Sequence, residues 1–354
     1  MLQALSHWFN KQFKDTELMM LLVFLFTIFI TLILFGGSLA PLLVAIALAY
    51  VLDDIVSLLC ACKFPRALAI GIVGVGAMLT ILFALLAILP VLTEQVGRVI
   101  AHIPQYVQLL RDTLHDLKDQ YPAGINADYL QQTIASAAGK IQELGGLLLS
   151  FSLASIPNMI ALGIYVVLVP VLVFFLLKDK DKVLQWGQQF LPDNRILLQR
   201  VWGELDTQIG NYIRGRFWES FMVGFVMWLI FYMMGHEYAL LLGVLTGISV
   251  WIPFVGAAVV TIPVILLSYF QWGFSEMTAY SLFAYAIIQL IDANIVIPWL
   301  FSEVVNLHPI AIIVAVLVFG SMWGILGVFF AIPLAALVQS VLVIIHERAA
   351  QQKI

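Results

Sequence analysis

Long uncharged stretches alternate with polar ones along this chain, and the two longest lie in its last third. Residues 238–275 and 304–345 contain no Asp, Glu, Lys or Arg. A helix crosses a membrane with only about 20 apolar residues, so each tract is too long for one straight span. We therefore predict that each tract is interrupted in its middle and forms a broken helix or a re-entrant helical hairpin.

Gly, Trp, Gly and Ile-Pro occur in the same order in both tracts, which indicates where the helices are expected to break. The predicted break positions are Gly247, Trp251, Pro253 and Gly256 in the first tract, and Gly320, Gly324, Gly327 and Pro333 in the second. Interrupted segments at corresponding positions are typical of the binding site of a transporter. Alternatively, these residues only pack and kink the helices, because Gly and Pro are common in membrane spans.

The first half of the chain predicts four more spans. Residues 18–52 are uncharged, and at about 1.5 Å per residue they would form a helix of about 50 Å, well beyond a ~30 Å hydrocarbon core. Gly36-Gly37-Ser38 and Pro41 are therefore expected to divide this helix in two. The predicted spans of this half are 18–35, 40–59, 67–91 and 147–177.

Two charged stretches interrupt this succession of spans. In residues 93–146, apolar side chains such as Val99, Ile103 and Val107 recur every three or four positions, which predicts an amphipathic helix. We expect this stretch to form a small water-exposed helical subdomain. Residues 178–216 hold seven basic and five acidic side chains and are predicted to form an amphipathic linker.

Lys and Arg are distributed unevenly, and their positions predict the orientation. With a cytoplasmic N-terminus, thirteen of the 17 basic residues lie in cytoplasmic segments and four lie in residues 93–146. Cytoplasmic loops carry an excess of Lys and Arg, so we expect both termini in the cytoplasm and residues 93–146 on the opposite side. The predicted divisions are N-terminal spans in 1–92, the water-exposed subdomain in 93–146, a span in 147–177, the cytoplasmic linker in 178–216, a transport core in 217–345 and a cytoplasmic tail in 346–354.

Composition supports the same fold class. The chain is 62% hydrophobic and 11% charged, with a mean hydropathy of +1.03, whereas soluble domains are about half apolar and a quarter charged. We predict an all-α polytopic membrane protein with about eight membrane-embedded helical segments. Cys60 and Cys62 are too close together to staple the fold and too few to hold a metal. No phosphate-binding loop or nucleophile elbow occurs, so we expect no enzyme activity, cofactor, metal or nucleic-acid partner.

A short polar island between the two uncharged tracts supplies the candidate binding residues, which are Gln289, Asp292, Asn294, Glu303 and His308. A carboxylate within a membrane is costly and indicates a functional site. No Lys or Arg lies within 70 residues before Asp292 or 50 after it, so we expect Asp292 to be protonated, hydrated or bound to a cation. Alternatively, Asp292 caps the end of a span, and Glu303 and His308 belong to an interfacial loop.

Further charges occur where two spans end. Arg214, Arg216 and Glu219 lie at the start of the span predicted for residues 217–234, and we interpret them as interfacial anchors. Arg216 and Glu219 are three residues apart and could also pair across one helical turn. We expect Asp53 and Asp54 to face other helices near the cytoplasmic surface.

The second half of the chain resembles the autoinducer-2 exporter family and, within it, a permease branch. The motifs that carry this resemblance are Tyr212-Ile-Arg214-Gly215, Leu242-Gly243, Ile252-Pro253-Phe254-Val255-Gly256, Leu307-His308-Pro309 and Ile332-Pro333. The resemblance implies a homo-oligomeric transporter of the bacterial inner membrane, pentameric in the family, that exports autoinducer-2 or exchanges sodium for protons. Arg216 and Glu303 depart from the residues common in the family, which leaves the substrate open.

Two classes of function are consistent with these features. The first is a secondary transporter or exporter of a small polar solute, coupled or not to H⁺ or Na⁺, with a sodium/proton antiporter or a channel as variants. The second is a membrane scaffold without transport activity, in which residues 93–146 dock partners. The paired interrupted tracts and the polar island favour the first class.

Overall fold

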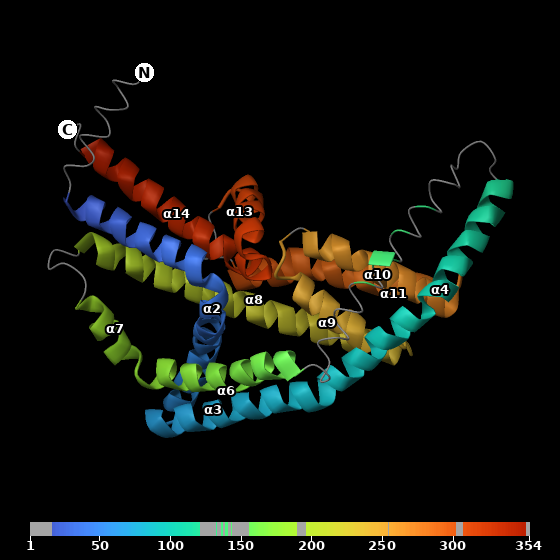
Figure 1. The fold of residues 1–354 in the computed structure, drawn as a ribbon, viewed down its shortest axis with the longest axis horizontal. Coiled ribbons are helices and arrows are strands. Elements are labelled where there is room, and N and C mark those ends of the chain that lie inside the picture. Colours follow the sequence, from blue (N-terminus) through green and yellow to red (C-terminus); the bar gives the residue numbers. More distant parts are fainter. Residues whose placement is uncertain are drawn as a thin grey trace, which may run out of the picture.

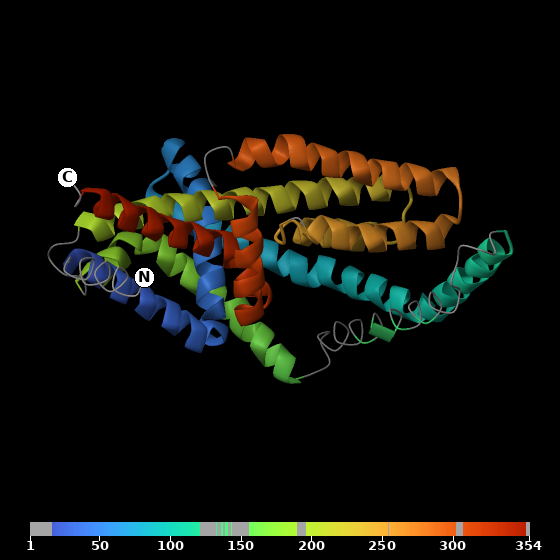
Figure 2. The same ribbon diagram turned by 90° about the horizontal axis from the view of Figure 1, so that it is seen from above.

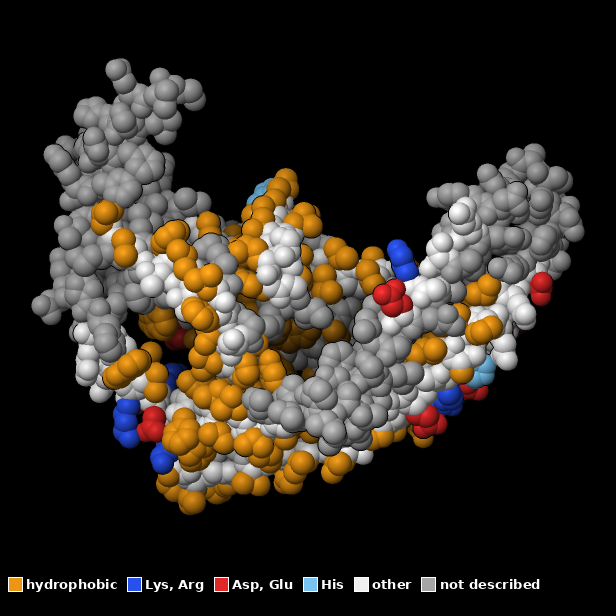
Figure 3. Space-filling view, viewed as in Figure 1, with side chains coloured by type: hydrophobic (Ala, Val, Ile, Leu, Met, Phe, Trp, Pro, Cys, Tyr) orange, Lys and Arg blue, Asp and Glu red, His pale blue; other side chains and the backbone are white. Residues whose placement is uncertain are grey.

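The structure is a computed structural model that describes residues 16–120, 156–189, 196–253, 255–301 and 307–351, together with single positions between 132 and 143. Every regular element in these ranges is a helix, which confirms the predicted all-α class. Hydrophobic side chains cover much of the face in Figure 3, while the described charged side chains gather along α4 and at the opposite end of the molecule. This distribution fits a protein whose middle is embedded in lipid.

Three helices form an N-terminal bundle. They are α2 (Thr16–Ala61), α3 (Arg66–Phe83) and α6 (Ile156–Lys178), and they pack around Ala45, Val56, Ala69, Val73 and Val173. The prediction that Gly36-Gly37-Ser38 and Pro41 separate two helices is wrong, because α2 is helical throughout. Figure 1 shows that α2 instead changes direction along its length, as expected of a helix with an interior proline.

One long helical segment leads away from this bundle. A π-helical turn, Ala84–Ile88, joins α3 to α4 (Leu89–Gln120). α4 reaches far from the bundle in both ribbon views (Figures 1 and 2). The segment predicted as a span followed by an amphipathic helix is thus continuous. Most of the rest of the expected 93–146 subdomain lies outside the described residues.

Four helices form the C-terminal bundle. α8 (Ile196–Met233), α9 (Ala239–Ser249), α10 (Val255–Trp272) and α11 (Glu276–Ile291) contact one another in a closed ring, and Figure 2 shows them running side by side. Their shared core includes Met227, Phe231, Leu242, Val264 and Tyr285. α7 (Lys180–Gln188) precedes α8, which continues without a break from the predicted linker into the predicted span.

The two predicted hairpins are present. Hairpin 1 consists of α9 and α10, with its tip at residues 250–253. After a π-helical turn (Asp292–Val296) and α12 (Ile297–Phe301), hairpin 2 consists of α13 (Pro309–Trp323) and α14 (Ile325–Gln351). Its break is Gly324, whose φ is +60°, a conformation that costs glycine little. Figure 1 shows α13 set at an angle to α14.

Five of the eight predicted break positions lie inside helices. Gly247, Gly320 and Pro333 lie inside α9, α13 and α14, and Gly256 and Gly327 lie in the first turns of α10 and α14. Gly247 instead lets α9 approach α8, because a Cβ atom there would lie 2.8 Å from the carbonyl oxygen of Ser220. Small residues at such crossings permit close packing of membrane helices.

Candidate ion and solute site

A buried cluster of charged groups lies between α8 and the end of α11. Arg216 and Glu219 are on α8, with 8% and 1% of their surfaces exposed, and Asp292 begins the π-helical turn after α11 with 7% exposed. α8 contacts α11 and α12, which brings these segments together although they are far apart in sequence. Arg216 and Glu219 therefore lie inside the protein, between helices.

Arg216 and Glu219 form a close ion pair. Nη1 of Arg216 donates to Oε1 of Glu219 at 3.0 Å and to Oε2 at 2.8 Å. The guanidinium also lies over two aromatic rings, with its central carbon 5.0 Å from the Phe301 centroid and 5.7 Å from that of Tyr212. Such cation–π contacts stabilise a desolvated cation, so Arg216 is held on three sides.

The second carboxylate, that of Asp292, has no such partner. Asp292 interacts electrostatically with Arg216 and with Glu219, but its buried Oδ1 has no hydrogen bond to any residue the structure describes. Arg216 Nε and the Tyr212 hydroxyl are likewise buried without hydrogen-bond partners there. Unsatisfied buried polar atoms are rare in folded proteins, so a site with three of them is suited to a polar ligand or ion.

The formal charges of this cluster do not cancel. One guanidinium faces two carboxylates, so the ionised cluster carries one excess negative charge. A buried uncompensated charge is unfavourable, and a bound proton or cation would neutralise it. The π-helical turn at Asp292 supports this view, because π-helical turns within α-helices frequently occur at functional sites.

α12 is positioned by a glycine. A Cβ atom on Gly215 would lie 2.7 Å from the Phe301 ring, so only glycine lets this ring pack on α8. Phe301 then lies against both Tyr212 and Arg216. This contact explains why a glycine follows Arg214 in the sequence.

The other predicted site residues are arranged differently. Gln289 is half-buried on α11, one turn before Asp292. Asn294 is exposed and donates to the carbonyl oxygen of Leu290 in its own helix at 2.8 Å. His308 is exposed and caps α13, its Nδ1 accepting from the Ile310 amide at 3.3 Å. Glu303 lies outside the described residues.

The tip of hairpin 1 contacts the second helix of hairpin 2 beside α8. Trp251 at the tip of hairpin 1 stacks on Phe329 of hairpin 2, with ring centroids 4.2 Å apart. An apolar cavity of about 220 Å³ adjoins this contact, lined by α2, α8 and both hairpins, including Val51, Ile213 and Phe330. The predicted facing arrangement of the two interrupted tracts is therefore present.

The two hairpins share one packing feature near their breaks. Gly256 and Gly327 lie in the first turn of the second helix of each pair, just after the break. A Cβ atom at either position would lie 1.8 Å from a backbone oxygen of the first helix, that of Ser249 or of Phe319. The similar spacing in the two tracts thus reflects the same close approach of backbone to backbone.

A second set of ion pairs ties α2 to the segments that follow α6. Asp53 pairs with Lys180 at 3.2 Å, and Asp54 pairs with Nε of Arg214 at 3.0 Å. Tyr50 also donates a short hydrogen bond to Asp206 of α8. Asp53 and Asp54 therefore face other helices, as predicted. Among the residues the structure describes, no group of three or more His, Cys, Asp or Glu side chains could hold a metal ion.

Comparisons with known proteins identify the relatives of this chain. The family model described as AI-2E family transporter matches residues 18–346. PerM of Escherichia coli (strain K12), a permease by its name, is 42% identical over 97% of each chain. YueF of Bacillus subtilis (strain 168), a transport protein by its name, is 26% identical over 89% of this chain and 85% of its own. The AI-2 transport protein TqsA of Escherichia coli (strain K12) is 23% identical over 84% of this chain and 83% of its own.

Proposed function

Because this chain belongs to the AI-2E transporter family, we propose that it is a secondary transporter of a small polar solute in the bacterial inner membrane. The solute is of the autoinducer-2 type, and its movement is coupled to protons or sodium ions. Relatives over nearly the full length are permeases or transport proteins by name, which supports the transport class over a scaffold.

The observation that carries this proposal is the buried Asp292 carboxylate beside the Arg216–Glu219 pair. Its Oδ1 is unpartnered among the described residues, and the ionised cluster has one excess negative charge. Binding and release of one cation would therefore change the net charge of the cluster between −1 and 0. A charge change in a protein with two broken helices is suited to coupling ion movement to alternating access.

Arg216 Nε and the Tyr212 hydroxyl, which have no hydrogen-bond partners among the described residues, are further groups that could bind a polar solute. Arg216 Nε can donate a hydrogen bond, Asp292 Oδ1 can accept one, and the Tyr212 hydroxyl can do either. A small hydroxyl-bearing solute could satisfy all three. The apolar cavity beside Trp251 cannot do so, since its lining offers no polar surface.

Sodium/proton antiport without an organic solute is the second candidate. The single excess charge favours it, because exchange of one proton for one Na⁺ at Asp292 requires no larger ligand. The two candidates differ in whether an organic solute moves, and one set of vesicles can distinguish them.

The test uses purified protein in liposomes that enclose a pH-sensitive dye. Wild type should move protons in response to a Na⁺ or autoinducer-2 gradient, and Asp292→Asn should lose this response while remaining monodisperse. Glu276→Gln is the matched control, because Glu276 is an exposed carboxylate at the start of α11. Movement of autoinducer-2 with no proton response would exclude proton coupling, and movement that is also independent of a Na⁺ gradient would exclude coupling to either ion. No movement of autoinducer-2 or of protons would favour the scaffold alternative.

A further inference from the structure

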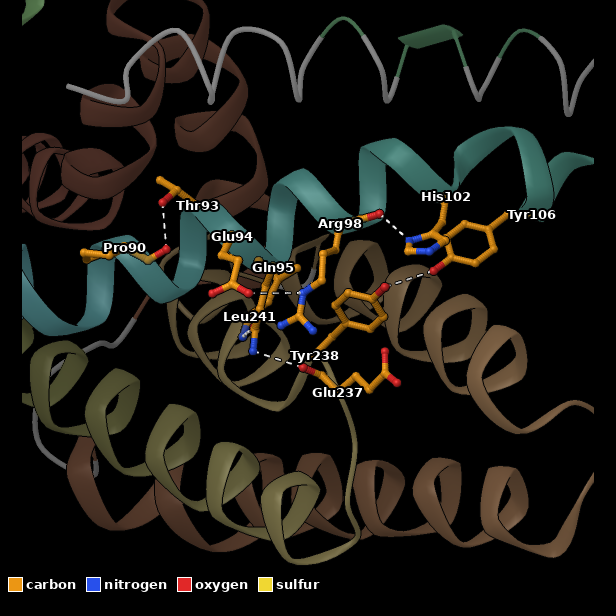
Figure 4. Close-up of polar contacts among 10 residues, drawn as sticks. All are labelled: Pro90, Thr93, Glu94, Gln95, Arg98, His102, Tyr106, Glu237, Tyr238 and Leu241. Atoms are coloured by element: carbon orange, nitrogen blue, oxygen red, sulfur yellow. Dashed lines mark hydrogen bonds and ion pairs between the residues drawn. The ribbon is translucent and has the colours of Figure 1, made fainter. Parts of the chain in front are cut away.

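α4 is fixed to hairpin 1 by side chains that the candidate site does not use (Figure 4). Gln95 of α4, which is 6% exposed, bonds to the backbone in both directions. Its Nε2 donates to the carbonyl oxygen of Glu237 at 3.0 Å, and its Oε1 accepts from the amide of Leu241 at 2.8 Å. The side chain amide is thus fully engaged with the start of α9.

These bonds make Gln95 a cap for a helix to which it does not belong. The first amides of any helix lack partners within that helix. The residue in the capping position of α9, Tyr238, makes no side-chain hydrogen bond to the first amides of the helix. The Leu241 amide, in the first turn, is satisfied by Gln95 instead. α4 therefore completes the first turn of hairpin 1.

The same face of α4 also holds the second helix of the hairpin. Tyr106 stacks on Phe270 of α10 with ring centroids 3.9 Å apart and planes at 4°, and its hydroxyl lies 3.1 Å from that of Tyr238. Seven residues further on, the Thr113 hydroxyl lies 3.0 Å from that of Tyr269. We call Gln95, Tyr106 and Thr113 with these partners the latch. The latch contacts both helices of hairpin 1 at the end opposite its tip.

A glutamine on α10 links the end of this helix to the turn before α9. The Gln271 side chain donates to the carbonyl oxygen of Gly235 at 2.9 Å and accepts from the Glu237 amide at 3.0 Å. The turn before α9 and the end of α10 are therefore joined to each other as well as to α4. A displacement of α4 would move them together.

At the other end of α4, the connection to the N-terminal bundle is suited to bending. The π-helical turn Ala84–Ile88 has no buried residue, whereas Ala69, Ile70 and Val73 of α3 are packed in the bundle. Departures from α-helical geometry within a helix often mark hinges. In this long helical segment, α3 is packed in the N-terminal bundle, and residues 84–88 form an irregular turn without a buried residue. α4 is hydrogen-bonded to hairpin 1.

We propose that α4 is a lever that moves hairpin 1, together with the C-terminal bundle in which hairpin 1 is packed, about residues 84–88, with Gln95 as the positioning residue that joins the hairpin to α4. Because the tip of hairpin 1 stacks on hairpin 2 through Trp251 and Phe329, a movement of α4 reaches the contact between the hairpins. The proposal does not depend on which ion or solute Asp292 binds.

The first test measures amide hydrogen exchange in the first turn of α9. Gln95→Leu removes both bonds at nearly constant size, and exchange of the Leu241 amide should become about fivefold faster, as for the loss of a helix cap. Gln95→Glu keeps the acceptor and should keep most of the protection, because an anion is favourable at a helix N-terminus. Gln105→Leu, on an exposed part of α4, is the control. Equal exchange in Gln95→Leu and wild type would overturn the capping role.

The second test measures distances between spin labels in liposomes. Cys60 and Cys62 are replaced by Ser, and labels are placed at Gln105 with Ile265 of α10, or at Gln105 with Leu79 of α3. The first pair should give one narrow distance distribution, and the second a broad or bimodal one. In the Gln95→Leu background, the first distribution should broaden. A first pair as broad as the second, or two narrow distributions, would overturn the lever.

Discussion

At the scale of single residues, the cluster around Arg216 combines a strong ion pair with an unbalanced charge. Glu219 takes both hydrogen bonds that Arg216 Nη1 donates, and Asp292 remains as a second carboxylate nearby. A buried pair is weak evidence for stability, but removal of the last partner of a buried charge is severe. Either carboxylate should therefore be enough to neutralise the buried Arg216 when the other is removed.

This compensation predicts a non-additive pair of substitutions. Glu219→Gln and Asp292→Asn should each lower the free energy of unfolding only modestly, because each leaves one carboxylate for Arg216. The double variant leaves a buried guanidinium without a carboxylate and should lose roughly 3–5 kcal/mol. Denaturant unfolding of the purified proteins in detergent measures all three. Simple additivity would mean that Asp292 does not interact with Arg216.

A second residue-scale prediction concerns His236, in the turn between α8 and α9. Burial against Phe231, Trp272 and Ser268 lowers the pKa of His236 to about 4, from about 6.5 in an unfolded chain. The unfolded state therefore binds more protons between these pKa values, so stability should be constant above pH 6.5 and fall from there towards pH 4.

The size of this effect is on the order of 2 kcal/mol at pH 5. His236→Gln should flatten the pH dependence of the melting temperature between pH 7 and 4.5. His102→Gln on α4, where the histidine is half-buried, is measured for comparison. If the melting temperature changes with pH equally in wild type and His236→Gln, other groups cause the pH dependence.

At the scale of elements, each hairpin depends on backbone contact at its break. Both Gly256 and Gly327 place an α-carbon against a carbonyl oxygen of the preceding helix. Neither oxygen can move without disturbing its own helix, since both belong to the backbone. The two hairpins are therefore built with the same close contact, although their helices differ in length.

This contact predicts that a single added methyl group is not tolerated. Gly256→Ala and Gly327→Ala should each cost more than the 1–3 kcal/mol typical of an overpacked site, because the Cβ atom would lie 1.8 Å from a backbone oxygen. Gly71→Ala and Gly163→Ala meet open space and serve as controls. Size-exclusion profiles and melting temperatures in detergent compare them. Stable Gly256→Ala and Gly327→Ala proteins would show that the helices can separate at their breaks.

At the scale of the whole molecule, the N-terminal bundle and the C-terminal bundle are joined in two ways. α2 contacts α8 and contributes Asp53, Asp54 and Tyr50 to ion pairs and hydrogen bonds with residues 180–214. On the other side, α4 holds hairpin 1 through the latch. The candidate site lies within the C-terminal bundle, where α8 meets the end of α11.

The orientation of this assembly in the membrane is a further prediction. Asp119, at the end of α4, should lie in the periplasm, and Lys180, at the start of α7, in the cytoplasm. In a variant without Cys60 and Cys62, a cysteine at Asp119 should react in intact cells with a thiol reagent that does not cross the inner membrane. A cysteine at Lys180 should react only after the membrane is opened. The reverse pattern would invert the topology.

The sequence by itself determined the class of this protein, the existence of two interrupted tracts and the importance of Asp292 as a candidate. These are local properties, because hydropathy, helix breakers and an isolated carboxylate can each be recognised within one segment. The tertiary structure determined how these segments pack and which of their side chains come into contact. It made Gly247 a packing residue, left Asn294 and His308 with local bonds, and brought Arg216 to a carboxylate that had no basic neighbour in sequence. The spacing of Arg216 and Glu219 gave a hint of their pairing, but nothing in Gln95 indicated a cap for α9. Contacts between helices depend on the packing of many side chains at once, and no single segment contains that information.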